Sequence, residues 1–374
     1  MNLYLRGINR RTWELVLCWC VAMALVWGIA AARVGSGPAG PRQITDPVSA
    51  LSTWDGEHYT AIATKGYSTE GPEARRFAFF PLLPALASAL GARSHAQLAG
   101  VLLSQFLYLV ALLLLSDLTK AYRSSESRWS DPAIWLLASP LSFFFAMFYT
   151  ESLFLVCTLG AVWAANRGER SWSVCAAFLA GLTRPTAICL PFLFVGEAVT
   201  AARRGEGWRW YLLPALATLV GIATYFLWVA ALTGQIDGYL GIQKRFWGSE
   251  RTIPYVPLAD RILSFLWEVR HLRLLPYHQL VQIGSALTVM IILAWGWRRL
   301  PVGWLAYAIA SLLLAHSSLP FASTARYEVV LFPIFVLMPW TVLARPRIAP
   351  VVFCFFVLVQ SFLLFKVASW QWVA

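Results

Sequence analysis

Long apolar segments alternate with short polar connections along almost the whole chain. The apolar segments have roughly 16 to 23 residues, which is the length that an α-helix needs to cross a bilayer. The pattern predicts an all-α polytopic membrane protein with about eleven transmembrane helices, in a range of about nine to twelve. We expect these helices near residues 12–32, 95–116, 133–148, 150–166, 172–183, 185–201, 210–231, 278–297, 301–317, 327–343 and 349–368.

The composition supports a membrane protein without a soluble domain. Of the 374 residues, 59% are hydrophobic and 13% are charged, whereas a globular domain carries about 25% charged residues. We therefore expect residues 1–374 to form a single integral-membrane domain. Because apolar segments recur along the chain, the first one is expected to be an uncleaved signal anchor rather than a cleaved signal peptide.

The chain is basic, with a formal net charge of +12. A basic chain can bind nucleic acid, but no basic tract here lies in a nucleic-acid-binding motif, so we exclude nucleic acid as a partner. Membrane topology and an anionic lipid substrate explain the charge better.

Arginine and lysine gather in the short connections at alternate ends of the predicted helices. By the positive-inside rule these connections are cytoplasmic, which places the N-terminus inside the cell and the C-terminus outside. We expect the protein in the plasma (inner) membrane. The basic residues concerned are Arg6, Arg10, Arg11, Lys120, Arg123, Arg128, Arg167, Arg170, Arg203, Arg204, Arg209, Arg298, Arg299, Arg345 and Arg347.

The same orientation places two long loops, residues 33–94 and residues 234–276, on the non-cytoplasmic side. Loops of this length in a compact protein are usually functional. The second loop is itself basic, either for solubility or to attract a phosphate at the outer membrane surface. In the first loop, residues 77–90 are apolar but too short to span, and Pro84 interrupts the backbone hydrogen bonding. We expect a helix that lies at the membrane interface or dips into it.

The hexapeptide Trp54–Tyr59 (WDGEHY) is the densest group of ionisable residues in the first loop. Such groups beside a bilayer are costly to hold away from water, so the cluster predicts a functional site. The alternative is a solvated polar loop. On a helix, Asp55 and His58 would share a face and Glu57 would point elsewhere, which disfavours a metal site made of these three. His58 could orient Asp55 or contact a substrate phosphate.

Three more charged residues stand out against apolar surroundings. Glu151 follows a tight outer turn, where it either belongs to the site or only interacts favourably with a helix N-terminus. Arg184 lies in an apolar run, so it is expected to face protein, a cavity or the interface. Arg326 begins a helix after a short outer loop that follows His316, and its guanidinium suits a phosphate. Interfacial anchoring is the alternative for Arg326.

Several motifs extend the pattern begun by the hexapeptide. Ile62-Ala63, Gly66-Tyr67 and the run 77–81 (FAFFP) follow it in order. This succession resembles the first-loop signature of the GPI mannosyltransferase 2 (PIG-V) family, within the GT-C superfamily of polytopic glycosyltransferases. Shorter pieces are similar to other parts of the family pattern, namely residues 149–154 (YTESLF), Thr183-Arg184-Pro185, and Gln243, Trp247, Arg251 and Pro254 in the second loop.

The resemblance implies a GT-C-like helical bundle and a hexosyltransferase of the inverting, single-displacement type. The expected donor is a polyprenyl-phosphate-linked sugar, with mannose the expected hexose, and the expected acceptor is a lipid or glycan on the outer face. Asp55 matches the family's first-loop catalytic aspartate and is the predicted general base, with Glu57 and His58 beside it in the catalytic group. The predicted substrate-binding residues are Trp54, Tyr59, Glu151, Arg184, Gln243, Trp247, Arg251 and Arg326.

We expect no cofactor, and a divalent metal is the less favoured alternative. The chain has no Asp-x-Asp signature of nucleotide-sugar enzymes, which fits a lipid-linked donor. It is compact compared with the eukaryotic family members, which indicates a bacterial relative.

Three other classes of function share the membrane topology. A lipid or sugar transporter or flippase is expected to have internal repeats and broken helices at mid-membrane, and the chain shows no repeat. Another outer-face polysaccharide transferase, such as a polymerase or ligase, would share the basic loops but gives no reason for the hexapeptide. A scaffold without catalysis would not need the carboxylates.

Overall fold

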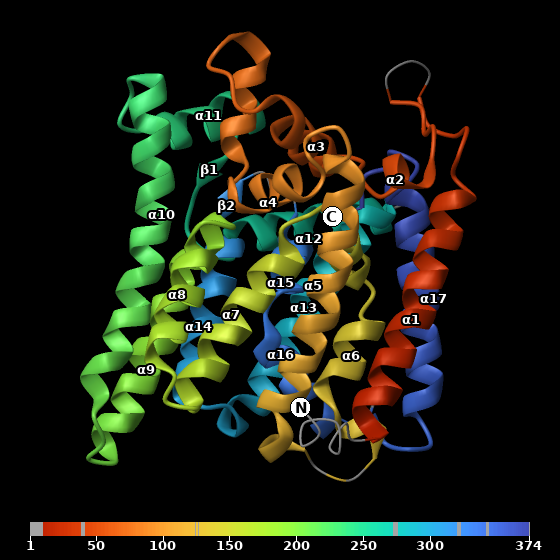
Figure 1. The fold of residues 1–374 in the computed structure, drawn as a ribbon. Coiled ribbons are helices and arrows are strands. Elements are labelled where there is room, and N and C mark those ends of the chain that lie inside the picture. Colours follow the sequence, from red (N-terminus) through yellow and green to blue (C-terminus); the bar gives the residue numbers. More distant parts are fainter. Residues whose placement is uncertain are drawn as a thin grey trace, which may run out of the picture.

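The computed structural model describes residues 10–38, 42–123, 125, 127–271, 276–319, 323–341 and 344–373. Helices run roughly parallel to one another through the length of the molecule, and shorter helices cover one end (Figure 1). Within the described residues, the β structure is one short antiparallel ladder between β1 (Glu250–Arg251) and β2 (Ser318–Leu319). The prediction of an all-α polytopic membrane protein is confirmed.

Six helices of the described chain are long and apolar enough to cross a membrane. Each coincides with a predicted span, so the period and length of the apolar segments located them correctly. They are α1 (Arg10–Ala31), α5 (Ala96–Leu118), η6 with α9 (Pro185–Cys189 and Leu190–Arg203), η7 with α10 (Trp208–Tyr211 and Leu212–Thr233), α13 (Tyr277–Gly296) with η8 (Trp297–Arg299), and α17 (Ala349–Val367).

The other predicted spans fall on shorter or interrupted helices. Two of them, near 133–148 and 327–343, are divided. The first is divided where Pro140 enters, because a residue before proline is pushed out of the helical region. Ser139, which precedes Pro140, is extended at φ −51° and ψ 137°. In the second, one helix ends at Glu328 and the next begins at Phe332. The pieces are α6 (Pro132–Ala138), η5 (Ser142–Ala146), α7 (Glu151–Asn166), α8 (Arg170–Gly181), α14 (Val302–Ala315), α15 (Thr324–Glu328), α16 (Phe332–Leu337) and η9 (Met338–Trp340).

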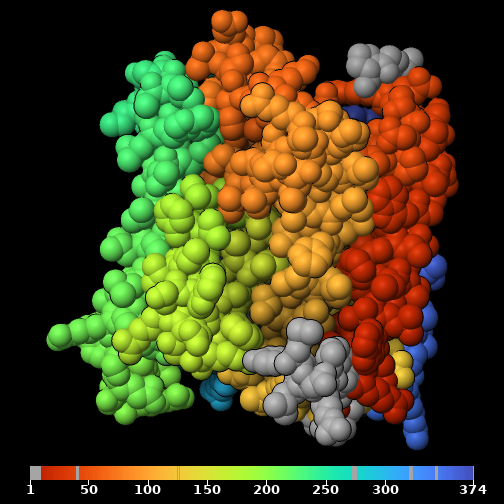
Figure 2. All heavy atoms as spheres, in the orientation of Figure 1, coloured from red at the N-terminus to blue at the C-terminus, as the bar shows by residue number. Residues whose placement is uncertain are grey.

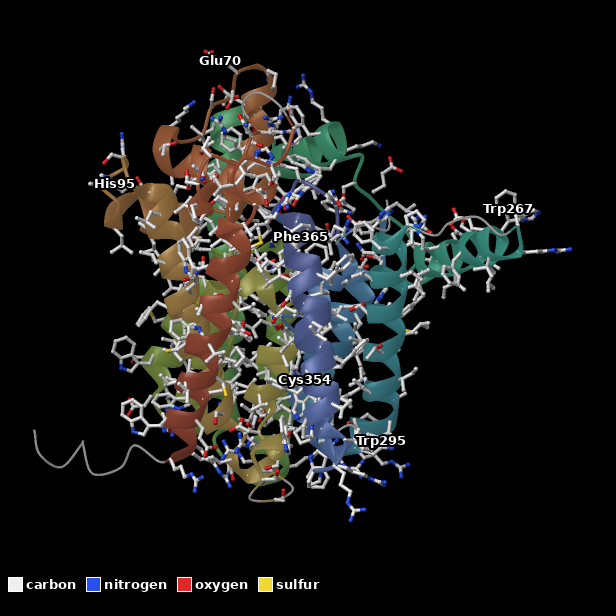
Figure 3. All side chains as sticks on the ribbon, turned by 90° about the vertical axis from the view of Figure 1, so that its right-hand side faces the viewer. Glu70, His95, Trp267, Trp295, Cys354 and Phe365 are labelled. Atoms are coloured by element: carbon white, nitrogen blue, oxygen red, sulfur yellow. The ribbon has the colours of Figure 1, made fainter. Side chains whose placement is uncertain are left out.

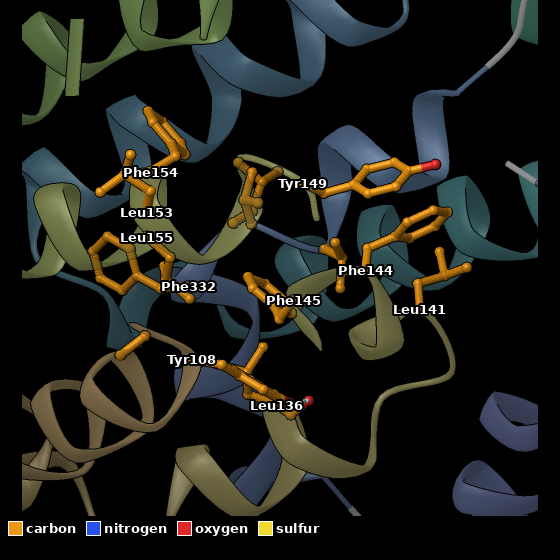
Figure 4. Packing of buried hydrophobic residues seen from close by; sticks show 14 of the residues in the cluster. Tyr108, Leu136, Leu141, Phe144, Phe145, Tyr149, Leu153, Phe154, Leu155 and Phe332 are labelled. Carbon is orange, nitrogen blue, oxygen red and sulfur yellow. Dashed lines mark hydrogen bonds between the residues drawn. The ribbon is translucent and has the colours of Figure 1, made fainter. Parts of the chain in front are cut away.

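The pieces of the two divided spans lie in the core. One of them, α15, brings the buried polar residues Arg326 and Glu328 into it. Around these pieces pack large aromatic side chains, such as Tyr108 stacked on Phe145 with ring centroids 5.0 Å apart (Figure 4). Every residue of η5 and α16 is buried. A helix that stops inside the bundle leaves backbone groups to be satisfied there, so its terminus is a natural place for a site.

Helices α8 and α10 approach each other so closely that side chains are excluded from their contact. A Cβ built on Gly181 would lie 2.4 Å from the carbonyl oxygen of Thr218, and one on Gly221 would lie 2.3 Å from that of Phe178. Small residues commonly allow this close packing between helices in membranes, where dispersion contacts replace the hydrophobic effect.

Most of the short helices of the two long loops gather at one end of the bundle. Figures 1 and 2 show residues 42–95 capping this end. Glu70 and His95 lie there in Figure 3, whereas Trp295 and the η8 arginines that follow it lie at the opposite end, near the start of α1. The capping elements are α2 (Pro47–Ala50), α3 (Asp55–Lys65), η2 (Gly71–Ala78), α4 (Leu82–Leu90) and α11 (Gly238–Trp247). Helix α12 (Val256–Arg270), which carries Trp267, instead projects sideways from the bundle in Figure 3. Elsewhere in the fold, two short 3-10 helices, η3 (Lys120–Tyr122) and η4 (Arg128–Ser130), connect α5 to α6.

Candidate functional site

A strained residue places the start of α3. Trp54 has φ 56° and ψ −117°, a backbone conformation that is uncommon for any residue with a side chain. Such strain persists only where the surroundings hold it, and it tends to mark functional sites. Here Thr53 is held on both sides, because its hydroxyl donates to the carbonyl of Val367 at 3.1 Å and its carbonyl accepts from the hydroxyl of Tyr149 at 3.0 Å. Asp55 is therefore presented as the first residue of the helix.

Asp55 meets Arg326 at the boundary between the capping helices and the bundle. Arg326 donates from Nη1 to Oδ2 of Asp55 and from Nε to Oε1 of Glu151. The side chain of Asp55 is 28% exposed and that of Arg326 only 10%. Asp55 is thus the most exposed of these three residues, and Arg326 and Glu151 are buried.

Glu151 and Arg184 continue the same group of charges into the bundle. Nη1 of Arg184 lies 2.8 Å from Oε1 of Glu151, and the two side chains are 4% and 0% exposed. The order Asp55–Arg326–Glu151–Arg184 alternates two carboxylates with two guanidinium groups, so the formal charges cancel. Buried ions are tolerated only when they are paired in this way. We call these four residues the charge network.

Aromatic rings hold the two guanidinium groups from the side. The Cζ atom of Arg326 lies 4.5 Å from the ring centre of Tyr149 and 5.5 Å from that of Phe144. Arg184 lies 5.4 Å from the ring centre of Tyr327. Cation–π contacts of this kind are stronger where water is excluded, and they restrict the rotamers of both arginines.

A small cavity opens at the exposed end of the charge network. It touches Asp55 and Arg326 and is otherwise lined by aromatic and aliphatic side chains. The lining residues are Trp54, Asp55, Phe144, Tyr149, Arg326, Val367, Trp372 and Val373.

The other ionisable residues of the hexapeptide point in different directions. His58 stacks on Phe79 at 4.5 Å and lies edge-on to Trp247 at 6.2 Å. Burial lowers the pKa of His58, although the charge of Asp55 opposes this effect. Because a lowered pKa disfavours the charged ring, His58 is neutral at pH 7. Glu57 is exposed and pairs loosely with Arg42 at 3.8 Å. In the described part of the chain, no three His, Cys, Asp or Glu residues lie close enough to share a metal ion.

Tyr59 and Gln243 have structural partners. The hydroxyl of Tyr59 lies 3.4 Å from Oγ1 of Thr150, which precedes α7, and burial raises the Tyr59 pKa. Nε2 of Gln243 donates to the hydroxyl of Tyr239 at 3.0 Å. The substrate roles of both residues stay predictions.

Arg251 joins the second loop to the end of α14. Its Nη1 donates to the carbonyl of Leu314 at 2.9 Å and to Oγ of Ser317 at 3.4 Å, beside the β1–β2 ladder. Among the described residues, these contacts place Arg251 in the loop framework rather than in the charge network. Its predicted role in substrate binding stays a prediction.

A second buried polar group contains one residue, Glu328, that the sequence analysis did not single out. Nε2 of His316 lies 3.1 Å from Oε1 of Glu328, and Ser285 donates to Oε2 of Glu328. His316 stood out in the sequence as a neighbour of the outer loop, but Glu328 did not. The available signal was the spacing, because Glu328 follows Arg326 by two residues at the start of an otherwise apolar segment.

Glu328 and Ser285 also touch a large apolar cavity inside the bundle. Its volume is about 510 Å³, which is within the range of small-molecule pockets. Helices α6, α13, α16 and α17 enclose it, and its remaining wall is almost entirely apolar. Representative lining residues are Trp135, Val281, Val289, Phe335, Phe356 and Leu363.

Comparison with known proteins finds a matching family model for part of the chain and a solved structure of similar fold. Residues 42–196 match the family model described as Mannosyltransferase (PIG-V). The GPI alpha-1,6-mannosyltransferase 2 of Cricetulus griseus is 31% identical over 153 residues, which cover 38% of this chain and 30% of that protein. The Homo sapiens protein is 30% identical over 156 residues, with 38% and 31% covered. The matched region thus spans about a third of these relatives.

The structural comparison covers far more of the chain. ArnT from Cupriavidus metallidurans, solved bound to undecaprenyl phosphate, superposes with a TM-score of 0.52 and 16% sequence identity. The superposition covers 87% of this chain and 59% of ArnT. At this identity the likeness concerns the fold alone, and it agrees with the all-α polytopic bundle that the sequence predicted.

Proposed function

Because the chain is PIG-V-like over residues 42–196 and has the GT-C fold over most of its length, we propose that it is a membrane glycosyltransferase. It transfers a hexose, with mannose the first candidate, from a polyprenyl-phosphate-linked donor to a lipid or glycan acceptor. The reaction takes place on the non-cytoplasmic face. The proposal extends beyond the matched region, since the charge network joins Asp55 and Glu151 inside that region to Arg326 outside it.

The contact between Asp55 and Arg326 carries this proposal. Sugar transfer from a lipid phosphate needs a base at the acceptor hydroxyl and a cation at the departing phosphate. Both groups are present here, side by side at the wall of one cavity. The base must come within about 2.6–3.2 Å of the oxygen whose proton it removes, and Asp55 is the more open partner of the pair.

The charges of the network fit a single displacement. The acceptor hydroxyl gives its proton to Asp55 while its oxygen bonds to the anomeric carbon, and the bond from that carbon to the phosphate oxygen breaks. The polyprenyl phosphate leaves from the opposite face, so the anomeric configuration inverts. Protonation neutralises Asp55, and the positive charge of Arg326 then becomes available to the leaving phosphate. Arg184 keeps Glu151 paired throughout.

The apolar cavity supports a lipid-linked substrate. A polyprenyl chain needs an apolar path that lies beside the reacting groups and within the membrane. The cavity wall includes Ala325 and Glu328, which flank Arg326 in α15. A chain lying between α13 and α17 could therefore present its phosphate toward Arg326.

The distribution of basic residues supports the sidedness. The η8 arginines and the start of α1 lie at the end opposite to the site (Figure 3). If the positive-inside rule holds, that end is cytoplasmic and the site is external. We also propose that the reaction uses no resident metal ion, since the arginines supply positive charge where the phosphate would leave. Assays with and without EDTA test this point.

The direct test uses purified protein in nanodiscs with radiolabelled polyprenyl-phosphate-mannose. We expect release of polyprenyl phosphate and transfer of label to an extracted membrane-lipid or glycan fraction. A matched donor carrying glucose tests the sugar, and a nucleotide-linked mannose should be inactive. Movement of the labelled lipid between leaflets without cleavage of the sugar–phosphate bond would favour a flippase and overturn the proposal.

A further inference from the structure

The helix that carries Arg326 is too short to fix its own position. α15 has five residues, and an isolated helix shorter than about 12 residues is only marginally stable. It begins after Ser323, whose backbone is left-handed at φ 59° and whose side chain makes no capping hydrogen bond. It is separated from α16 by Leu331, which is not helical at φ −78° and ψ 79°. The placement of Arg326 therefore depends on contacts from other helices.

One side of α15 borders a cavity instead of packed side chains. Ala325 and Glu328 line the apolar cavity of about 510 Å³ described above. Where a helix borders a cavity, it lacks the dispersion contacts that fix the rest of a close-packed interior. On this side, hydrogen bonds from neighbouring helices are the contacts that can hold α15 in place.

Gln282 of α13 caps the start of α15 from outside. Its Oε1 accepts hydrogen bonds from the hydroxyl of Thr324 at 2.5 Å and from the backbone amide of Ala325 at 3.1 Å. The first amides of a helix have no acceptor within it, and a side-chain oxygen at that point stabilises the start of the helix. Because the amide of Ala325 can only donate, the oxygen of Gln282 and not its nitrogen faces α15.

Glu328 fixes the other end of α15. Ser285 donates to Oε2 of Glu328, and Nε2 of His316, which follows α14, lies 3.1 Å from Oε1. Ser285 comes three residues after Gln282, so the two share a face of α13. That face therefore contacts both ends of α15, and Figure 1 shows the two helices beside each other.

Arg326 lies between these two anchored ends. Residues two apart on an α-helix point in nearly opposite directions, so Arg326 turns toward the charge network while Glu328 turns toward Ser285 and His316. We propose that Gln282 and Ser285 are positioning residues for Arg326. They hold α15 where one guanidinium reaches both Asp55 and Glu151. The inference rests on the proposed function for its effect on catalysis, but the placement itself can be measured without turnover.

The test measures sugar transfer from polyprenyl-phosphate-mannose by the full chain in nanodiscs. Gln282→Leu removes the acceptor of Thr324 and Ala325. We expect kcat to fall roughly 10- to 100-fold, because a misplacement of about 1 Å can cost about 10²-fold. The KM for the donor should change much less, since the charge of Arg326 acts mainly on the departing phosphate. Ser285→Ala should lower kcat by a smaller factor, because His316 still holds Glu328.

Gln279→Leu is the matched control for Gln282→Leu. Gln279 lies one turn earlier on α13 and is also buried, but its Oε1 has no hydrogen-bond partner among the described residues. Its substitution should leave kcat unchanged. An unchanged kcat in Gln282→Leu, or an equal loss in Gln279→Leu, would overturn the proposal. An unchanged kcat in Ser285→Ala would remove Ser285 from it.

A second background separates positioning of Arg326 from general stability. The ammonium of Arg326→Lys cannot bridge two carboxylates as the guanidinium does, so the exact place of α15 should matter less to it. Gln282→Leu should then cost a smaller factor in kcat than it does in the wild type. Equal factors in both backgrounds would mean that Gln282 only stabilises the fold. If Gln282→Leu does not elute as a monodisperse species, Thr324→Val takes its place, since it removes the hydroxyl and keeps the branched side chain.

Thermal unfolding tests the placement independently of turnover. If Gln282 keeps Arg326 in its ion pairs, Gln282→Leu and Arg326→Met act on the same contacts. The double variant should then lose less Tm than the sum of the two single losses, whereas additive losses would overturn the proposal. A wild-type chain that transfers no sugar but shows the coupled losses would remove the proposed function and leave the positioning of Arg326 standing.

Discussion

Arg326 donates a hydrogen bond to Asp55 although the two residues lie 271 positions apart in the sequence. The contact is made from the interrupted segment of α15 and from the strained turn at Trp54, so two irregular elements meet at one point. It makes Asp55 and Arg326 interdependent, because each holds the other's charge. Substitutions at either residue are therefore expected to change both the chemistry and the pairing of the network.

Asp55→Asn should abolish most of the transfer activity. The amide keeps the size of the side chain but cannot accept the proton of the acceptor hydroxyl. General base catalysis contributes roughly 10²–10⁴-fold, so we expect at least about a hundredfold loss in kcat. Asp55→Glu should also be poor because one added methylene moves the carboxylate. The comparison needs a binding assay with polyprenyl-phosphate-mannose, in which Asp55→Asn should behave like the wild type. Near-normal turnover would remove Asp55 as the base.

Arg326→Ala should cost more activity than Arg251→Ala. Arg326 lies in the charge network, whereas the guanidinium of Arg251 bonds to Leu314 and Ser317. Loss of one cationic or hydrogen-bonding contact to a developing charge typically costs about 10²–10³ in kcat. Arg326→Lys should recover only part, since an ammonium cannot bridge Asp55 and Glu151 as the planar guanidinium does. Equal losses in the two alanine variants would place Arg251 at the phosphate as well.

Periodicity was sufficient to predict the long helices and the class of fold. The spans at α1, α5 and α13 follow from apolar segments of membrane-spanning length, and nothing in the tertiary structure overrides them. Two predicted spans proved to be interrupted, one at Pro140 and the other between Glu328 and Phe332, where α15 ends and α16 begins. Hydropathy depends only on the apolar composition of a segment, so it could not show that these two helices are interrupted.

The pairing within the site could not be read from the sequence. Asp55, Glu151, Arg184 and Arg326 were each singled out as charges in apolar surroundings, but only the fold shows that they form one chain of ion pairs. Glu57 was grouped with Asp55 by proximity in the sequence, yet it is exposed and pairs with Arg42. Trp372, which lines the small cavity beside Asp55, gave no signal, because tryptophan near the end of a membrane helix is ordinary.

Glu151→Gln should destabilise the protein as well as inactivate it. The Glu151 side chain is fully buried between two guanidinium groups, and its neutralisation leaves positive charge uncompensated. Breaking a buried pair from one side costs about 3–5 kcal/mol. Thermal unfolding followed by size-exclusion chromatography should show a clear fall in Tm. Glu57→Gln is the control, since an exposed carboxylate should leave the Tm unchanged. A stable Glu151→Gln protein would mean that water or another group balances the arginines.

Stability should fall below about pH 6.5 in part because of His58. Burial lowers its pKa in the folded state, so the unfolded chain takes up the proton first as the pH falls. Stability rises with pH wherever the unfolded state binds more protons, and the contribution is therefore lost between the ordinary pKa of 6.5 and the lower folded value. Measured Tm values at pH 7.5 and 5.5 should differ less in His58→Gln than in the wild type. An identical difference in both proteins would show that the ring is free to protonate in place.

The sidedness of the site can be tested without any substrate. Ser68 lies in the first loop near the capping helices, and Glu206 is exposed in the connection between α9 and η7, where the chain carries basic residues. If the site is external, a cysteine in place of Ser68 should react with an impermeant thiol reagent in whole cells, and one in place of Glu206 only after lysis. Both variants need the six native cysteines replaced, or the wild-type labelling subtracted, because several are exposed. The reverse pattern would put the site on the cytoplasmic face. An outer-leaflet donor would then be impossible, while the charge network and its chemistry would remain.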